Sequence, residues 1–313
     1  MRRAASDVLT FVIQILLNKA LHCPLTLMTD KNNNCDSCAQ KGSCKDEKDV
    51  RQGKECTQKA NRMARVKHKI IVASGKGGVG KSTVSVNLAR ALQMKGLRVG
   101  ILDADITGPD IAKLLGIEDA RLTQGPDGIE PPVAGGIKAA SMAFVLSSRD
   151  SPVVWRGPMK MAAIKQFIED VNWGDLDYLI VDLPPGTSDE PLSVVQLIPD
   201  LAGAIIVTTP QEVALLDSRK AVNMVRALKM PVLGIIENMS GLVCPRCGEK
   251  ISIFGSGGGE RMAQEMDVPF LGAIPIDPRV CALGDSGRTF IDSANPAQSS
   301  FGGIVDRLLE MFG

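Results

Sequence analysis

The sequence predicts an α/β fold in which a mainly parallel β-sheet is flanked by helices. Two observations support this prediction. From residue 69 onward, short apolar runs alternate with stretches whose apolar residues recur at helical spacing, and a glycine-rich turn joins the first run to the first such stretch. Strands that alternate with helices are joined by right-handed crossovers, which place parallel strands side by side and helices over the sheet.

Each predicted element is a short segment bounded by turn residues. The first strand covers residues 69–74, and the helix after it covers 81–95 and is ended by Gly96. The other predicted strands cover residues 99–102, 178–181, 204–208, 232–236 and 270–274. The other predicted helices cover residues 159–170, 190–197, 213–228 and 259–266. Residues 125–148 are less regular, and we expect a hairpin or an insertion there.

Composition excludes several classes of partner. The chain has 313 residues, a formal net charge of +1 and only 4% aromatic residues. A balanced charge gives no bulk attraction to nucleic acid or to an anionic membrane, and few aromatics leave little for base stacking. The apolar run at residues 8–17 is too short to span a bilayer. We therefore expect a cytoplasmic location, no nucleic-acid partner and no stable membrane association.

The chain divides into three predicted segments. Residues 67–313 form the main domain. Residues 28–66 are rich in cysteine and charged side chains, and residues 30–66 contain no Leu, Ile, Phe, Tyr or Trp. Such a segment cannot build a core, so we expect it to be mobile unless a metal orders it. Residues 1–27 are interpreted as an extension upstream of the true start at Met28.

The turn after the first predicted strand matches the phosphate-binding pattern G-x-x-x-x-G-K-[ST]. Its flanks are the strand and the helix that the pattern requires. Main-chain N–H groups of such a loop surround phosphates, and the helix N-terminus adds positive partial charge. We expect Lys81 to reach the β- and γ-phosphates of ATP and Ser82 to ligate Mg²⁺. The predicted nucleotide-binding residues of this loop are Gly75, Lys76, Gly77, Gly78, Val79, Gly80, Lys81, Ser82 and Thr83.

Lys76 is a second lysine inside this loop. Its position resembles that in the deviant P-loop of the MinD/Mrp/nitrogenase-iron-protein class. The resemblance implies that Lys76 reaches the nucleotide of a second subunit, much as an arginine finger does. A homodimer and a catalytic role for Lys76 beside Lys81 are therefore expected. The alternative is an ordinary solvated loop lysine.

Carboxylates at two strand ends complete the predicted phosphate site. Asp103 and Asp105 end one predicted strand, and Asp182 follows four apolar residues of another. Ligands bind at the carboxyl ends of strands in such sheets. We expect Asp182 to hold Mg²⁺, Asp103 to support the metal, and Asp105 to position the attacking water as a catalytic residue. The roles of Asp103 and Asp105 are interchangeable on the sequence alone.

Eight cysteines predict metal binding. Cys244 and Cys247 form a CxxC pair, which supplies two of the four ligands that zinc or a cubane cluster takes. The missing pair would come from Cys35 and Cys38, from Cys281, or from the same loop of a second subunit. On spacing alone, zinc and an iron–sulfur cluster are equally compatible, and a redox CxxC is a further reading. For Cys281 itself we expect a small buried residue rather than a ligand.

A second group of cysteines lies near the N-terminus. Its candidate ligands for a second cluster or a zinc ion are Cys35, Cys38, Cys44 and Cys56. The fourth ligand is ambiguous, because Cys23 lies as far before the CxxC as Cys56 lies after Cys44. If the chain starts at Met28, Cys56 is the remaining candidate.

Together these motifs resemble the Mrp (ApbC-type) family of iron–sulfur carrier ATPases. The resemblance rests on the loop 75–83, Asp103-x-Asp105, the segment 182–187, Glu237-Asn-Met-Ser240 and Cys244-Pro-x-Cys-Gly248, with 155–160 and 274–279 as further segments. It implies a 4Fe-4S cluster bridged between subunits by Cys244 and Cys247, its transfer to apo iron–sulfur client proteins, ATP hydrolysis, and contact of Asn238 with adenine. The N-terminal cysteine motif resembles the eukaryotic cytosolic iron–sulfur scaffold ATPases.

Two other classes share the phosphate loop. MinD- and ParA-like positioning ATPases use a basic amphipathic tail or a basic patch, but the last predicted helix, near residues 304–312, is not basic. Neither class accounts for the CPxCG motif. An electron-transfer ATPase like the nitrogenase iron protein would use the same bridged cluster for redox chemistry. Adjacent ligands in a loop favour a removable cluster and hence carriage.

Overall fold

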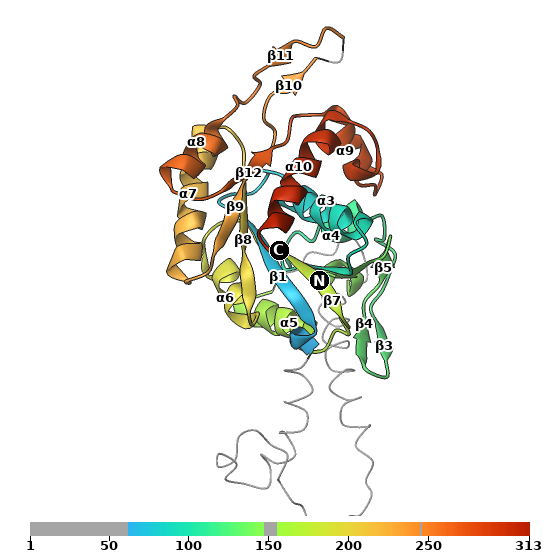
Figure 1. Ribbon diagram of the computed structural model, residues 1–313. Helices are drawn as coiled ribbons and strands as arrows, with labels where there is room; N and C mark the ends of the chain where they lie inside the picture. The colour runs from blue at the N-terminus through green and yellow to red at the C-terminus, as the bar shows by residue number, and fades with distance from the viewer. Residues whose placement is uncertain (1–61, 147–154, 245) are drawn as a thin grey trace, which may run out of the picture.

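The computed structural model describes residues 62–146 and 155–313, with the exception of residue 245. Their centre is an eight-stranded sheet in the order β12-β9-β8-β1-β7-β2-β6-β5 (Figure 1). All neighbouring strands are parallel except β5, which is antiparallel to β6. The strands are β1 (Val66–Ser74), β2 (Val99–Asp103), β5 (Val133–Ala134), β6 (Ile137–Ala140), β7 (Leu176–Asp182), β8 (Leu201–Thr208), β9 (Val232–Glu237) and β12 (Phe270–Ala273). The predicted fold class is confirmed.

Helices cover both faces of this sheet. Figure 1 shows α7 and α8 on one side and α3, α4, α9 and α10 on the other, while α5 packs beside α6. The helices are α3 (Lys81–Met94), α4 (Ile111–Leu114), α5 (Gly157–Glu169), α6 (Asp189–Leu197), α7 (Glu212–Ala227), α8 (Gly258–Glu265), α9 (Pro278–Asp285) and α10 (Pro296–Glu310). There are also two short 3-10 helices, η1 (Met142–Phe144) and η2 (Phe290–Asp292).

The core lies between the sheet and its two helical layers. The central strands are almost continuously apolar, because a parallel sheet covered on both faces has no solvated side. Ile70, Ile71 and Val72 of β1 are fully buried. The largest buried side chain is Trp173, whose indole N–H donates to the carbonyl of Phe167 over 3.0 Å. This core fixes the strand ends on which the site is built.

The first strand begins three residues earlier than predicted. Lys67 and His68 interrupt the apolar pattern, yet both belong to β1. Lys69 is buried, and its ammonium donates to the carbonyls of Met63 and Val66 over 3.2 Å each. Burial away from water lowers the pKa of Lys69. The chain just before β1 is thereby tied to the sheet.

The irregular region after β2 contains hairpins, one of the two predicted alternatives. Strands β3 (Thr123–Gly125) and β4 (Gly128–Glu130) pair in antiparallel fashion, and β5 and β6 form the edge of the main sheet. In the described part of the chain, no helix has the length and apolar character needed to cross a membrane. The predicted segment 1–27, and residues 28–61 of the next, lie outside the described residues.

Candidate functional site

Residues 75–80 form the loop that joins β1 to α3, and residues 81–83 are the first turn of α3, as the motif predicts. Gly80 adopts a φ of 85° and directly precedes the first turn of α3, a left-handed conformation that favours glycine. Gly75 lies against α7 so closely that a Cβ atom there would be 2.1 Å from the main-chain carbon of Asp217. The loop therefore has its shape only because these two positions carry no side chain.

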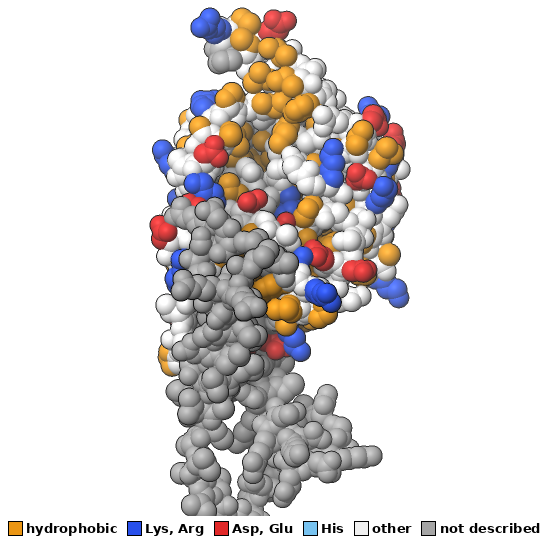
Figure 2. Space-filling model, turned by 180° about the vertical axis from the view of Figure 1, so that it is seen from behind, with side chains coloured by type: hydrophobic (Ala, Val, Ile, Leu, Met, Phe, Trp, Pro, Cys, Tyr) orange, Lys and Arg blue, Asp and Glu red, His pale blue; other side chains and the backbone are white. Residues whose placement is uncertain are grey.

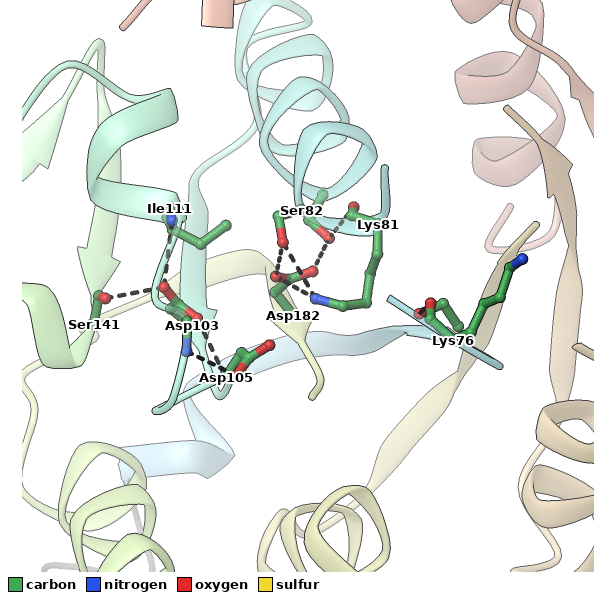
Figure 3. Close-up of polar contacts among 11 residues, drawn as sticks. Lys76, Lys81, Ser82, Asp103, Asp105, Ile111, Ser141 and Asp182 are labelled. Carbon is green, nitrogen blue, oxygen red and sulfur yellow. Dashed lines mark hydrogen bonds and ion pairs between the residues drawn. The ribbon is translucent and has the colours of Figure 1, made fainter. Parts of the chain in front are cut away.

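Lys81, Ser82 and Asp182 form a tight cluster at the start of α3 (Figure 3). The ammonium of Lys81 and the hydroxyl of Ser82 both donate to Oδ2 of Asp182, over 2.7 Å each. Ser85 donates to Oδ1 of the same carboxylate over 2.6 Å. Lys81 and Asp182 are both buried, so this ion pair is shielded from solvent. The structure brings three predicted site residues together and adds Ser85, which the sequence reasoning missed.

Asp103 lies beside Asp182 in the register of β2 and β7 and is completely buried. Its carboxylate accepts hydrogen bonds from the hydroxyl of Ser141 at 2.9 Å and from the main-chain N–H groups of Ile111 at 3.3 Å and Asp105 at 3.2 Å. Burial, followed by the nearby charge of Asp182, raises the pKa of Asp103 well above its ordinary value. Its oxygens thus already hold the loop that follows β2.

Asp105 differs from Asp103 in its exposure. It lines the open cavity next to the phosphate loop, and its Oδ1 accepts from the N–H of Gly108 over 3.2 Å. Partial burial raises the pKa of Asp105. Of the two carboxylates, Asp105 is therefore the partly exposed one, while its role in positioning the attacking water remains a prediction.

Lys76 has a different environment from Lys81. Figure 3 shows its side chain directed away from Lys81 and Asp182. The hydroxyl of Ser74 donates to its main-chain carbonyl over 2.9 Å, which fixes the backbone of the loop there. Among the described residues, no carboxylate or carbonyl lies within bonding distance of its ammonium. The loop is thus held at Lys76 by its backbone, and the lysine charge has no partner in the part of the chain that the structure describes.

A cavity of about 610 Å³ opens beside the loop, a volume suited to a nucleotide. It brings together segments that are far apart in the sequence. Pro185 and Asp277 line it from the segments 182–187 and 274–279, which are part of the resemblance described above, whereas Asp110 and Phe254 had not been singled out from the sequence. No local motif marks Asp110 and Phe254, because only the fold places them next to the phosphate loop.

Asn238 lines the same cavity and follows directly after β9. Its amide nitrogen donates to the carbonyl of Val79 over 2.9 Å. A Cβ atom at Gly80 would lie 2.1 Å from this nitrogen. The structure therefore places Asn238 against the phosphate loop, while its contact with adenine remains a prediction.

Cys244 and Cys247 lie at the tip of a hairpin that projects from the body of the protein (Figure 1). Its strands are β10 (Leu242–Val243) and β11 (Lys250–Ile251). The N–H of Cys244 donates to the carbonyl of Glu249 and the N–H of Gly248 donates to the carbonyl of Cys244, both over 2.9 Å. Hydrogen bonds from the main chain of Cys247 and Arg246 lower the pKa of the Cys244 thiol. Cys247 is exposed and Cys244 is partly exposed.

The hairpin also carries exposed apolar side chains. Figure 2 shows hydrophobic side chains gathered along this projection. They belong to Val243, Ile251, Ile253 and Phe254, which are between 39% and 50% exposed. Apolar side chains grouped on a projecting element are typical of a surface that another protein covers.

The prediction for Cys281 is wrong in one respect, because this residue is exposed rather than buried. It lies on α9, a helix with no buried residue, and its thiol faces Asp285 at 3.6 Å. No group of three or more His, Cys, Asp or Glu side chains that could enclose a metal ion occurs among the described residues. Cys281 therefore does not complete a site with Cys244 and Cys247. The predicted N-terminal ligands Cys35, Cys38, Cys44 and Cys56 lie outside the described residues.

Comparison with known families accounts for this combination of phosphate loop and cysteine hairpin. The family model described as NUBPL iron-transfer P-loop NTPase matches residues 65–309. The chain belongs to this family. The resemblance inferred from the motifs is thus confirmed, and the chain is a P-loop NTPase of the iron-transfer type.

Individual members of the family support the assignment over nearly the whole chain. The iron-sulfur cluster carrier protein of Methanocaldococcus jannaschii is 49% identical over 284 residues, which cover 90% of this chain and 98% of that protein. The cytosolic Fe-S cluster assembly factor NUBP2 homolog of Nematostella vectensis is 49% identical over 252 residues, or 78% of this chain and 93% of that protein.

Solved structures related to the family agree on the fold. A nucleotide-binding protein from Archaeoglobus fulgidus in complex with ADP aligns with a TM-score of 0.68 at 40% identity, covering 76% of this chain and 93% of that one. The MinD cell division protein of Aquifex aeolicus aligns with a TM-score of 0.57 at 22% identity, covering 78% and 97%. At that identity the MinD likeness extends to the fold alone.

Proposed function

We propose that this protein is an ATP-dependent iron–sulfur cluster carrier that holds a 4Fe-4S cluster between two subunits and passes it to apoproteins in the cytosol. The observation that carries the proposal is that one chain presents both a complete phosphate site and an exposed pair of thiols. A relative that aligns with 90% of the chain bears the name iron-sulfur cluster carrier protein.

The nucleotide site supports ATP as the substrate. Lys81, at the start of α3, would neutralise the β- and γ-phosphates, and Asp105, which lines the cavity, would position the attacking water. Ser82 and Asp182 offer two adjacent oxygen ligands of the kind Mg²⁺ prefers, and the metal would neutralise charge on the phosphates there. Asp103 would support the metal indirectly, because its own oxygens already accept hydrogen bonds from the chain.

Three features support a homodimer. Cys244 and Cys247 supply two thiols, and a cubane cluster requires four ligands. The exposed apolar side chains on the same hairpin fit burial by a second copy about a two-fold axis. The side chain of Lys76 points away from Lys81 and Asp182, and its ammonium has no partner among the described residues 62–146 and 155–313, residue 245 excluded. One dimer would cover the apolar side chains, complete the ligand set and give Lys76 a partner nucleotide.

Exposure of the thiols favours carriage over electron transfer. A cluster at the tip of a projecting hairpin is open to a client protein, whereas a redox centre gains from burial that keeps its ligands in place. The N-terminal cysteines would hold a second cluster or a zinc ion. The nucleotide-dependent step in loading or release would be closure of the two subunits around ATP.

The decisive experiment is anaerobic reconstitution with iron and sulfide. We would compare wild type, the double variant Cys244→Ala/Cys247→Ala, and Cys281→Ala as a matched control that removes one exposed thiol outside the hairpin. Iron, sulfide and zinc are measured per dimer, and transfer to an apo-aconitase-type acceptor follows. We expect the double variant alone to lose one four-iron cluster per dimer together with transfer.

Two outcomes would contradict the proposal. Tightly held zinc in wild type, with no iron uptake, would make the protein a zinc-stabilised ATPase. A cluster that is reduced and reoxidised but never leaves for the acceptor would make it an electron donor. In either case the ATP site described above would keep its role.

A further inference from the structure

Lys160 lies in the segment 155–160, to which no role has yet been given. It belongs to the first turns of α5, and only 12% of its side chain is exposed. Its ammonium donates to Oε1 of Glu190 over 2.7 Å and to the hydroxyl of Thr107 over 3.0 Å. One nearly buried cation thus contacts two segments that are 83 residues apart in the chain.

The two partners of Lys160 lie on the two connections that follow the strands with the site carboxylates, one in a loop and one in a helix. Thr107 lies two residues after Asp105, in the loop that leaves β2. Glu190 lies in the first turn of α6, which follows the loop that leaves β7 after Asp182. Near the strands these loops are also joined by the main chain, because the N–H of Ala104 donates to the carbonyl of Asp182 over 2.9 Å. Farther from the strands, Lys160 links the same two connections through Thr107 and Glu190.

We propose that Lys160 is a positioning residue for ATP hydrolysis, which holds the Asp105 loop against α6. Asp105 accepts a hydrogen bond from the N–H of Gly108, so the loop folds into a short turn. Lys160 donates a hydrogen bond to Thr107 within that turn. Without this contact the turn would keep its internal hydrogen bond but lose its place relative to the phosphate loop. A displacement on the order of 1 Å at such a position can cost about a hundredfold in rate.

Two observations indicate that Lys160 positions the Asp105 loop and neither binds nucleotide nor mainly stabilises the fold. Lys160, Thr107 and Glu190 are absent from the lining of the nucleotide cavity. Glu190 is 37% exposed, so water can solvate its carboxylate when the lysine is removed. Loss of the cation should therefore affect the rate of hydrolysis far more than nucleotide affinity or the unfolding temperature. This inference rests on the proposed ATPase activity.

The test compares Lys160→Met, Lys160→Arg, Glu190→Gln and the double variant Lys160→Met/Glu190→Gln. Lys165→Met is the matched control, since Lys165 lies on the same helix, is 58% exposed and pairs with Glu169 over 3.7 Å. For Lys160→Met we expect kcat to fall about tenfold or more, with ADP affinity within about twofold of wild type. Lys160→Arg should recover most of the rate, and the double variant should be no slower than Lys160→Met.

A second readout does not depend on turnover. In nucleotide-free protein, amide hydrogen exchange of peptides covering residues 104–110 and 186–192 should be faster in Lys160→Met than in wild type and in the Lys165→Met control. If wild type hydrolyses no ATP, the proposed ATPase activity is wrong. In that case the hydrogen-exchange rates alone decide whether Lys160 holds the Asp105 loop in place. An unchanged kcat with unchanged exchange, or a parallel loss of kcat, ADP affinity and thermal stability, would overturn the inference.

Discussion

The side-chain amide of Asn238 donates a hydrogen bond to the carbonyl of Val79 in the phosphate loop, over 2.9 Å. The residue before it, Glu237, is completely buried, and its carboxylate accepts from the N–H groups of Gly257 at 2.9 Å and Gly259 at 2.5 Å. The cysteine hairpin lies in the segment between Asn238 and Gly257. Glu237 holds the C-terminal end of this segment, and Asn238 attaches its N-terminal end to the phosphate loop.

Replacing Asn238 with alanine should weaken nucleotide binding and leave the fold intact. The change removes the hydrogen bond to Val79 and the predicted contact with adenine, and one hydrogen bond contributes about 1 kcal/mol. We expect the affinity for ADP, measured by titration calorimetry, to fall about five- to tenfold. The control is Asn172→Ala, whose amide contacts Glu130 away from the cavity. Equal ADP affinity in both variants would show that Asn238 has no part in the nucleotide site.

Gly75→Ala should destabilise the folded protein, whereas Gly77→Ala should not. A Cβ atom at position 75 would meet main-chain atoms of α7 at 2.1 Å, which must move apart. At position 77 the nearest atom, Cγ of Pro185, lies at 4.0 Å. We expect a loss of about 3 kcal/mol in unfolding free energy for Gly75→Ala, from chemical denaturation of nucleotide-free protein. Similar denaturation midpoints for the two variants would mean that Gly75 is not packed closely against the main chain of α7.

Mixed dimers test whether Lys76 acts on the nucleotide of a second subunit. Alone, Lys76→Ala should bind ADP but hydrolyse little ATP, and Lys81→Met should bind nucleotide poorly because it lacks the lysine paired with Asp182. Mixing the two gives some dimers in which an intact Lys76 faces an intact phosphate site. ATPase activity should therefore reappear in the mixture. Wild-type activity of Lys76→Ala alone, or no recovery on mixing, would mean that the lysine does not act across a dimer.

Alkylation of Cys244 should depend on pH differently in the folded and in the unfolded protein. Hydrogen bonds from the main chain of Cys247 and Arg246 stabilise the Cys244 thiolate, so the pKa of Cys244 is below that of an ordinary thiol. In metal-free protein, the rate at which iodoacetamide modifies Cys244 should therefore reach half its maximum at a lower pH than in the unfolded protein. Peptide mass spectrometry after timed quenching measures each cysteine separately. Identical pH midpoints in folded and unfolded protein would exclude this stabilisation.

The local part of this fold could be predicted from the sequence. The strands next to the phosphate loop, the helix after it and the strand-end carboxylates each leave a short-range pattern, and the structure has them within a few residues of the predicted bounds. The boundary of β1 was missed because charged residues at 67–69 break the apolar run while still pairing in the sheet.

Contacts between distant segments could not be predicted in this way. The hydroxyl of Ser85 reaches Asp182 across 97 residues, and Lys160 reaches Thr107 across 53. Neither contact has a signature in composition or spacing, because it depends on the order in which the strands assemble. The exposure of Cys281 was missed for the same reason, since α9 packs too lightly to bury any of its residues.

The cysteine hairpin has only two paired residues in each strand. A ribbon of that size is marginally stable by itself in water, so whatever Cys244 and Cys247 bind would contribute much of the free energy that orders it. Loaded and empty protein would then differ in the shape of their outermost surface as well as in their cargo. A client that recognises the ordered hairpin would distinguish a carrier with something to deliver from one without, and would release the carrier once delivery is complete.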